Sequence, residues 1–336
     1  MASRRLLNNA RSLSTTATSN PRTLLLTFDA FDTLFHPRKP VQEQYAAAAH
    51  DFGFSRTAIT ADKIKAAFKD VFRSQMARYP NYGRADVIRG QYGGPKQWWE
   101  EVIRGCFTQI LSRGNENASA KKIEIPSEML GALLDRFAGA EGYALYPDVV
   151  PFFKRMRELK SSRSSGFDRV IIGVISNSDD RIPAVLKALG LKVGDLRADR
   201  DISSMALPGF EQRGTASELG KPGEVNDREP SQIKKSLLDN DLDMIITSYE
   251  AGEEKPNRLI FEVAEQQARL LVQQPIGAES VESWTRVHVG DDYGKDYIAA
   301  REAGWQSYLV RGNAQDQPAQ RLTSLMDLIH ELRMGS

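Results

Sequence analysis

The stretch LLLTFDAFDTLFHP, residues 24–37, contains a short apolar run that leads directly into a pair of acids. Residues 24–28 carry a single polar side chain, that of Thr27, which is the composition expected of a buried β-strand. Asp29 follows this strand at once, and Asp32 follows three residues later. A carboxylate at the end of a buried strand is a candidate nucleophile or metal ligand, and the stretch alone leaves open which acid serves.

Beyond residue 145 the sequence alternates between apolar runs and helix-like segments. RVIIGVISN, residues 169–177, suits a strand buried on both faces, whereas IPAVLKALG, residues 182–190, has the pattern of a helix closed by a glycine. Such alternation predicts a parallel, doubly wound α/β sheet of the Rossmann-like type. The other predicted strands are 244–248, 286–290 and 306–310, and the other predicted helices are 148–160, 258–271 and 297–304.

A long segment directly after the first strand, residues 37–145, interrupts this pattern. Apolar side chains recur in it at helical spacing, which predicts a helical domain inserted into the sheet domain. Ser127 is the expected N-cap of its last helix. The helices are predicted within residues 41–79, 97–112 and 127–138.

A second interruption covers residues 196–241, which are polar and rich in Gly, Pro, Ser and charge. Such a composition has little apolar surface to bury, so we expect a flexible insertion there. The predicted core domain then comprises residues 23–36 and 146–320, with this insertion inside it.

The composition excludes several classes of function. Among 336 residues, 41% are hydrophobic and 26% are charged, with a formal net charge of +1, so neither a nucleic-acid partner nor a membrane partner is expected. No run reaches the roughly 18 apolar residues of a membrane-spanning helix. The single cysteine, Cys106, excludes an internal disulfide and a multi-cysteine zinc site.

Residues 1–22 differ from the remainder of the chain. They include four arginines and many serines and threonines, and no acid precedes Asp29. This pattern is typical of a mitochondrial transit peptide, which predicts a mitochondrial location. The alternative is a disordered tail on a protein of the cytoplasm or nucleus, and on either interpretation the segment lies outside the fold.

Polar residues that suit catalysis stand at the carboxyl ends of the predicted strands. Because these ends meet at one edge of a parallel sheet, where ligands bind, the residues should converge. They are Asp29, the pair Ser176 and Asn177, Lys255 in SYEAGEEKPNRLIF, and the pair Asp291 and Asp292.

These stretches resemble the four motifs of the haloacid dehalogenase-like hydrolase superfamily. LLLTFDAFDTL resembles its nucleophile motif, VISNS its Ser/Thr motif, GEEKPNRLIF its lysine motif and VGDDYGKDYIAAREAGW its metal motif. The resemblance covers nearly the whole chain from residue 23. QWWEEV and GDDYGKDY are similar to one branch of the superfamily, in which a helical cap lies between the first strand and the second motif.

The resemblance favours Asp29 over Asp32 as the nucleophile. Asp29 in that place puts Thr33 at the motif's threonine position and Phe31 where its phosphatases carry a second aspartate, the general acid and base. The other register would put Asp29 inside the strand and His36 at the threonine position. Asp32 is then expected on the turn that leaves the strand, with its side chain directed elsewhere.

The resemblance also implies a role for each site residue. Asp29 would attack phosphorus, Ser176 would donate a hydrogen bond to the phosphate, and Lys255 would neutralise charge between them. Thr33 and Asn177 would help to bind the phosphate. The implied Mg²⁺ ligands are Asp29, the backbone carbonyl of Phe31, and Asp291, with Asp292 and Asp296 in support.

The function so implied is a Mg²⁺-dependent phosphohydrolase for a small phosphorylated substrate selected by the cap. Phe31 removes the acid that protonates the leaving oxygen, an effect typically worth about 10²–10⁴-fold, so turnover of ordinary esters should be weak. One alternative is a non-catalytic binding or regulatory protein that keeps the fold. A less favoured one is a 2-haloacid dehalogenase, because the acids near Asp291 suit a cation better than an anionic haloacid.

Two further groups of residues have structural interpretations. Trp98 and Trp99 are adjacent on a predicted helix and are expected to pack in the core. The four histidines show no metal-ligand spacing and are expected to be structural or exposed.

Overall fold

The computed structural model describes residues 22–113, 124–162, 166–198, 237–272, 283–312 and 316–334. The expected targeting segment, apart from Arg22, lies outside these residues, as do residues 199–236 of the expected flexible insertion. In the described part of the chain no helix is both long enough and apolar enough to span a bilayer.

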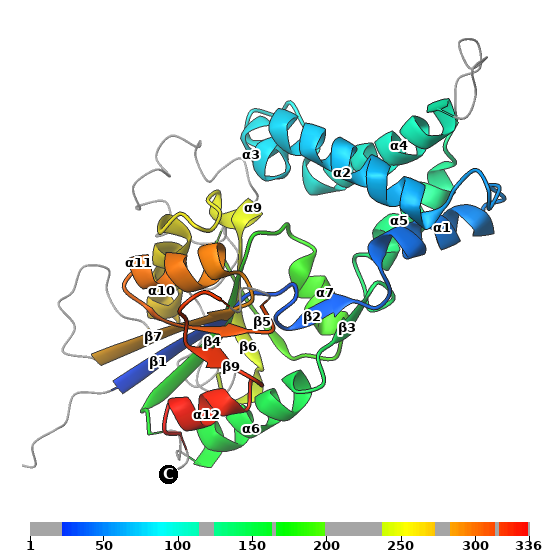
Figure 1. The fold of residues 1–336 in the computed structure, drawn as a ribbon. Coiled ribbons are helices and arrows are strands. Elements are labelled where there is room, and N and C mark those ends of the chain that lie inside the picture. Colours follow the sequence, from blue (N-terminus) through cyan, green and yellow to red (C-terminus); the bar gives the residue numbers. More distant parts are fainter. Residues whose placement is uncertain are drawn as a thin grey trace, which may run out of the picture.

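A seven-stranded sheet forms the core, and all its strand pairs are parallel (Figure 1). This confirms the predicted doubly wound α/β architecture. In spatial order the strands are β5 (Val193–Arg197), β6 (Leu242–Thr247), β4 (Arg169–Ser176), β1 (Arg22–Phe28), β7 (Ser283–Gly290), β8 (Gln306–Val310) and β9 (Arg321–Leu322).

The first strand, β1, is the middle strand of this sheet. It pairs with β4 on one side and β7 on the other, so the backbone hydrogen-bonding groups on both of its edges have partners. Leu24 and Leu26 pack into one hydrophobic cluster and Leu25 into the other, since neighbouring side chains of a strand point to opposite faces. The continuous apolar run of the sequence is therefore explained by burial on both faces.

Helices cover both faces of the sheet (Figure 1). Phe152 and Phe153 of α6 pack on the face of Leu24 and Leu26, and Phe261 of α10 packs on the face of Leu25. The bounds are α6 (Val149–Ser162), α7 (Ile182–Ala188), α9 (Ser248–Ala251), α10 (Leu259–Leu271), the π-helix η6 (Tyr293–Ile298), α11 (Ala299–Glu302) and α12 (Asp327–Glu331).

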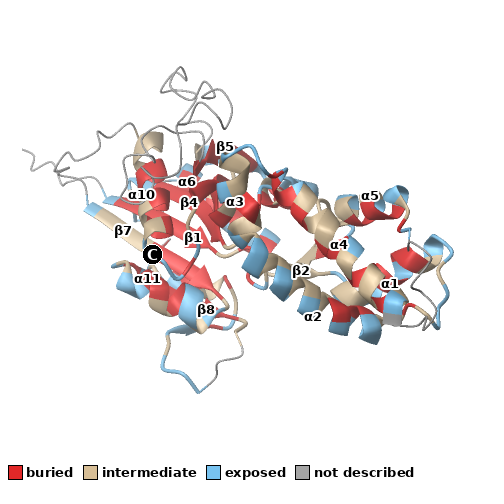
Figure 2. Cartoon of the chain, turned by 90° about the horizontal axis from the view of Figure 1, so that it is seen from above, coloured by how far each residue is buried: buried red, intermediate tan, exposed pale blue. Residues whose placement is uncertain are grey.

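Two short strands follow β1 and precede α6, and the described residues between them form five helices. We call residues 38–142 the helical insertion. Strands β2 (Phe35–Pro37) and β3 (Tyr143–Leu145) pair antiparallel where the chain leaves and re-enters the core. Figure 2 shows that the central strands are buried, whereas α1, α2 and α5 present exposed residues. The helices are α1 (Val41–Asp51), α2 (Ala61–Arg78), α3 (Pro80–Ile88), α4 (Gly94–Arg113) and α5 (Ser127–Arg136).

The structure divides one predicted helical segment of the insertion and shows that one predicted cap is wrong. The helical pattern of residues 41–79 belongs to two helices, because Gly53 adopts a φ of +85° after α1 and Thr60 caps α2 by accepting from the Lys63 amide. Ser127 is not an N-cap: Pro126 holds that position, and the Ser127 hydroxyl donates to Glu128 instead.

The structure also extends the core beyond its expected limits. Strand β5 includes residues 196–197, which were expected to begin the flexible insertion, and Leu196 is buried there. At the other end, β9 and α12 follow residue 320, the expected end of the core. Both strands are short edge elements with little sequence pattern of their own.

Candidate active site

Asp29 stands at the centre of the sheet edge, one residue after β1 ends. Its backbone amide donates to the Val289 carbonyl at 2.9 Å, which continues the pairing with β7 beyond the last strand residue. Asp32 lies on the turn with a φ of +53° and an exposed side chain, as the preferred register expects. The structure therefore places Asp29, and not Asp32, among the other predicted residues.

Lys255 reaches this edge from the segment after β6 and is almost fully buried. Its ammonium donates to Asp29 Oδ1 at 2.9 Å, Asp296 Oδ1 at 2.6 Å and the Ile175 carbonyl at 2.9 Å. Burial opposes the charge, but the two carboxylates outweigh it and raise the pKa of Lys255. The side chain is thus held as a cation with its donors satisfied.

Asn177 positions Lys255 through the backbone. Its side-chain amide accepts from the Lys255 N–H at 2.7 Å and donates to the Lys255 carbonyl at 2.7 Å. This paired contact joins the end of β4 to the lysine segment. The structure therefore gives the Asn177 amide a different use from the phosphate contact expected for it.

Asp296 receives hydrogen bonds on both carboxylate oxygens. Besides Lys255, His288 Nε2 lies 3.2 Å from Oδ1, and the Asp292 amide donates to Oδ2 at 3.0 Å. Burial works against ionisation, but the Lys255 charge and the His288 contact prevail and hold the pKa of Asp296 below its usual range. Asp296 is therefore an ionised partner of Lys255.

His288 supports Asp296 from behind and is fully buried on β7. Its Nδ1 lies 2.9 Å from the Thr27 hydroxyl on β1, and burial lowers the pKa of His288. The interpretation of the histidines from spacing alone missed this contact. The available signal was a histidine within a strand expected to be buried on both faces, where a polar side chain needs a partner.

The absence of a side chain at Gly290 allows Asp296 to approach β7. A Cβ built at Gly290 would lie 2.1 Å from Asp296 Cγ, closer than any real contact. The π-helix η6 begins after Asp292, whose Oδ1 accepts from the amides of Gly294 and Lys295. Asp292 therefore caps this helix, and this is how it supports the site in the structure.

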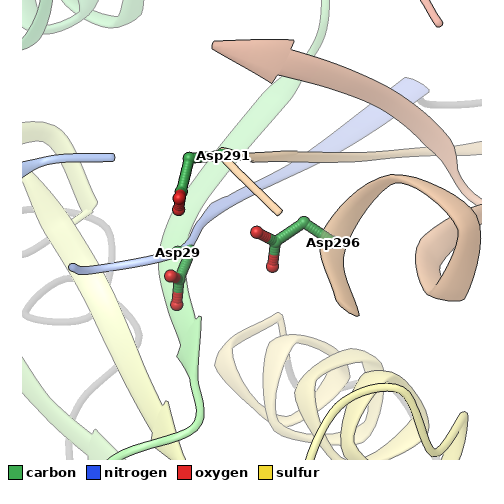
Figure 3. A group of neighbouring side chains, drawn as sticks. All are labelled: Asp29, Asp291 and Asp296. Carbon is green, nitrogen blue, oxygen red and sulfur yellow. The ribbon is translucent and has the colours of Figure 1, made fainter. Parts of the chain in front are cut away.

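Asp291 completes a cluster of acids at the site. One carboxylate oxygen from each of Asp29, Asp291 and Asp296 lies within 4.8 Å of the others, and Figure 3 shows the three side chains as neighbours. Burial, followed by the charges of Asp29 and Asp296, raises the pKa of Asp291 to about 7. Burial also raises the pKa of Asp29, against the influence of Lys255. Uncompensated negative charge of this kind suits a hard cation.

The remaining predicted residues surround this cluster. Thr33 is buried and its hydroxyl donates to Asp291 Oδ1 at 3.3 Å, so it orients an acid in this structure. Ser176 is buried at the end of β4, and a hydrogen bond from its side chain lowers the pKa of Asp29. The Phe31 ring packs edge-on against Phe35 and Tyr143, with centroids 4.7 and 5.6 Å away.

A second polar group beside the site had no motif in the sequence. Asp179 and Arg181, just after β4, pair through Nε and Nη2 of the arginine, each at 2.9 Å. Trp99 Nε1 donates to Asp179 Oδ2 at 2.7 Å from the helical insertion. Trp98 is fully buried as expected, but Trp99 lines a cavity between the insertion and the core.

Comparison with known proteins identifies a matching family and several similar proteins. Residues 24–304 match the haloacid dehalogenase-like hydrolase family. A relative in Saccharomyces cerevisiae, "Uncharacterized protein YMR130W", is 29% identical over 87% of this chain and 73% of its own. "Haloacid dehalogenase-like hydrolase domain-containing protein 3" of Xenopus laevis is 27% identical over 85% of this chain and 83% of its own. The Homo sapiens protein of the same name is 24% identical over 88% of this chain and 85% of its own. This agrees with the branch indicated by QWWEEV and GDDYGKDY.

Among solved structures, a 2-haloacid dehalogenase from Pseudomonas syringae pv. Tomato DC3000 is similar with a TM-score of 0.44 and 15% identity. That similarity covers 93% of this chain and 98% of the other.

Proposed function

Because this chain belongs to the haloacid dehalogenase-like hydrolase family, we propose that it is a Mg²⁺-dependent phosphohydrolase acting on a small phosphorylated substrate. The observation that carries the proposal is the Lys255 ammonium, which bridges Asp29 at 2.9 Å and Asp296 at 2.6 Å beside the carboxylate of Asp291. A buried cation next to a strand-end carboxylate is an arrangement suited to a transferring phosphoryl group.

Asp29 is the proposed nucleophile. One carboxylate oxygen would attack phosphorus to form an aspartyl-phosphate, while the bond to the leaving oxygen breaks and that oxygen keeps the electron pair. Burial favours the protonated acid, so the reaction depends on groups that keep Asp29 ionised. Lys255 and the hydrogen bond from Ser176 both lower the pKa of Asp29.

The chemistry of the donor set fits Mg²⁺. Asp296 is committed to Lys255, His288 and the Asp292 amide, which leaves Asp29 and Asp291 as the carboxylate ligands. The proposed third protein ligand is the backbone carbonyl of Phe31, as the family motif implies. The bound ion would neutralise phosphate charge and orient the group for in-line attack. Thr33 fixes the Asp291 carboxylate for this purpose.

The helical insertion is the proposed cap of the site. Asn81 of α3 donates to the Ser248 carbonyl at 2.7 Å and accepts from the Ser248 hydroxyl at 3.1 Å, and Trp99 of α4 donates to Asp179. These contacts hold the insertion against the core segments that follow β4 and β6. A cover of this kind excludes water from the transferring group.

Acetyl phosphate tests the proposed function, because it is small and its leaving carboxylate needs no proton. We expect hydrolysis that requires Mg²⁺ and stops on addition of EDTA. Asp29→Asn should remove both turnover and the covalent phosphoenzyme, while its circular dichroism spectrum stays that of the wild type. Retained turnover in this variant would exclude Asp29 as the nucleophile.

Phe31 favours one second candidate, a non-catalytic binding protein that keeps the metal site. A phenylalanine stands where the related phosphatases have their acid and base, and it packs on Phe35 and Tyr143. This candidate predicts Mg²⁺ binding without hydrolysis of acetyl phosphate.

A further inference from the structure

A cavity of about 280 Å³ lies between the helical insertion and the carboxyl end of the sheet. Phe31 and Asn177 contribute to its wall, so it adjoins the strand ends that carry Asp29 and Ser176. Apolar and aromatic side chains make up most of the wall, including Phe72, Tyr82, Trp99 and Leu134. An apolar cavity of about 150 Å³ accommodates benzene, so this one has room for a larger aromatic group.

The charged side chains of the wall are matched with each other. Among the described residues that line the cavity, only Asp179 and Arg181 are charged, and they pair through two hydrogen bonds of 2.9 Å. Trp99 Nε1 also donates a hydrogen bond to the Asp179 carboxylate, and the Arg181 guanidinium lies 4.7 Å from the centroid of the Trp99 ring. A charged group in this cavity would lose its hydration without gaining a partner, which is costly. The cavity therefore selects an uncharged occupant.

Three tyrosines line the cavity, and no hydrogen bond to their hydroxyls is found within the described residues. They are Tyr45, Tyr82 and Tyr143, and burial raises the pKa of each, so each remains a neutral donor. Tyr45 and Tyr143 are 2% and 5% exposed, which leaves little access to bulk water. A bound molecule with an acceptor oxygen would give these hydroxyls a hydrogen-bond partner.

Resting on the hydrolase function proposed above, we propose that the substrate is a phosphate monoester of an uncharged phenol, whose aryl group occupies this cavity. Flat rings pack favourably against an aromatic wall, and offset or edge-on contacts add to the area they bury. The hydroxyls of the wall would favour an aryl group that carries an ether or hydroxyl oxygen.

The proposed leaving group also agrees with the phenylalanine at position 31. Attack by Asp29 breaks the bond between phosphorus and the phenolic oxygen, which departs with the electron pair as a phenolate. A phenol ionises near pH ~10, as the tyrosine side chain does, so its anion leaves far more readily than an alkoxide. The phenolate then takes a proton from water, and no side chain at position 31 is needed as an acid.

The wild-type protein tests the proposal with two substrates of matched chemistry. 2-Naphthyl phosphate and 6-carboxy-2-naphthyl phosphate share ring and leaving oxygen and differ by one distal charge. We expect kcat/KM to favour the uncharged ester by at least about tenfold, since apolar pockets discriminate by ~10–200-fold for small changes. Equal values for the two esters would overturn the proposal.

Binding of the free phenols gives a readout that needs neither metal nor turnover. 2-Naphthol should quench the fluorescence of Trp99 saturably, and 6-hydroxy-2-naphthoate should bind at least about tenfold more weakly. Trp99→Phe should lose most of the quenching, which assigns the signal. Equal affinity for the two phenols, or no saturable binding of 2-naphthol, would contradict the proposal.

A variant of the wall provides a further test with a matched control. Leu134→Arg introduces a charge at a partly buried wall position, and Val150→Arg introduces the same side chain on α6 at a position that is 54% exposed. We expect the ratio of kcat/KM for 2-naphthyl phosphate over acetyl phosphate to fall by at least about tenfold in Leu134→Arg only. An unchanged ratio in a folded Leu134→Arg protein would count against the proposal.

Acetyl phosphate separates this inference from the proposed function. If Asp29- and Mg²⁺-dependent hydrolysis of acetyl phosphate is present and the naphthyl preference is absent, only the substrate class is wrong. If acetyl phosphate is not hydrolysed, the proposed function itself fails, and saturable 2-naphthol binding would then mark the cavity as a binding site alone.

Discussion

Phe31 is the residue that most distinguishes this site from a phosphatase with a full motif. Its ring packs against Phe35 and Tyr143 and forms part of the cavity wall. The position is therefore apolar in its surroundings as well as in its side chain. The replacement of an acid by phenylalanine fits a reaction in which the leaving group needs no proton.

We predict that Phe31→Asp raises turnover of alkyl phosphates more than turnover of aryl or acyl phosphates. The introduced carboxyl group would supply the missing proton, a gain of at most about 10²–10⁴-fold. The measurement is kcat/KM for an alkyl ester and for p-nitrophenyl phosphate, expressed per folded molecule. Correction for folded protein matters, because a carboxyl group buried among aromatic rings lowers stability.

Phe31→Asn is the matched control, since it has the size and polarity of the aspartate without its proton. The ratio between the two substrates should not rise in this variant. A ratio that stays at the wild-type value in folded, Mg²⁺-binding Phe31→Asp would show that the acid is not what limits turnover.

Among the secondary-structure elements, β7 and the π-helix after it determine how Asp296 meets Lys255. Asp296 leans across Gly290, and both of its oxygens are engaged by hydrogen bonds. A local widening of a helix is often found at functional sites, where it directs a side chain that a regular helix would not.

We predict that Gly290→Ala destabilises the protein by about 1–3 kcal/mol, as overpacking of a filled site does. The added methyl group would meet Asp296 Cγ at 2.1 Å and push the carboxylate away from Lys255. Urea unfolding measures the free energy, and hydrolysis of acetyl phosphate should fall with it.

Gly131→Ala on α5 is the control for a glycine-to-alanine change. A Cβ at position 131 would meet no atom within 4 Å, so alanine there should stabilise the helix by up to about 1 kcal/mol. Equal stability of the Gly290 and Gly131 variants would contradict the steric argument.

Local sequence pattern predicted the elements near the site well, and for a physical reason. Strands such as β4 (Arg169–Ser176) are buried on both faces, so their apolar runs are continuous and visible without any partner. The choice of Asp29 over Asp32 came instead from the resemblance to the family motif, because the strand pattern alone left it open. Elements at the edge of the sheet, such as β5, carry weaker patterns because they bury less of their surface.

Contacts between distant segments were outside the reach of the sequence. His288 meets Thr27 only because β1 and β7 lie side by side, and the Trp99 contact with Asp179 joins residues 80 positions apart. No spacing rule relates such residues. Their discovery required the packed structure.

At the scale of the whole molecule, the acid cluster predicts a link between metal binding and stability. Asp29, Asp291 and Asp296 repel one another, and a bound Mg²⁺ would remove this repulsion. A ligand that binds only the folded state adds about 2.7 kcal/mol at a concentration ~100 times its Kd, so Tm should rise by several degrees. Differential scanning fluorimetry with Mg²⁺ and with EDTA measures the rise.

Asp291→Asn should abolish most of this rise, because it removes one proposed ligand and one negative charge. The same variant should be at least as stable as the wild type in EDTA, since the repulsion is smaller. A full Mg²⁺-dependent rise in Asp291→Asn would place the cation elsewhere.

The N-terminal residues lead to a separate prediction about location. Their arginines, hydroxyl side chains and lack of acids favour a mitochondrial targeting signal. A fusion of residues 1–28 to a fluorescent reporter should therefore enter mitochondria. Replacement of Arg4, Arg5 and Arg11 by glutamine in that fusion should prevent entry, and a diffuse wild-type fusion would contradict the prediction.

The short β2–β3 ribbon holds the two ends of the helical insertion side by side. In the ribbon Phe35 pairs with Leu145 and Pro37 pairs with Tyr143. Just beyond these pairs, the Arg38 amide donates to the Gly142 carbonyl at 2.9 Å. A replacement whose own ends lie as close together could join the core at the same two chain crossings with little added cost of loop closure, although it would lose the contacts of Asn81 and Trp99 with the core. If the insertion selects the substrate as proposed, grafting would change selectivity while the strands that carry Asp29 and Asp291 remain untouched.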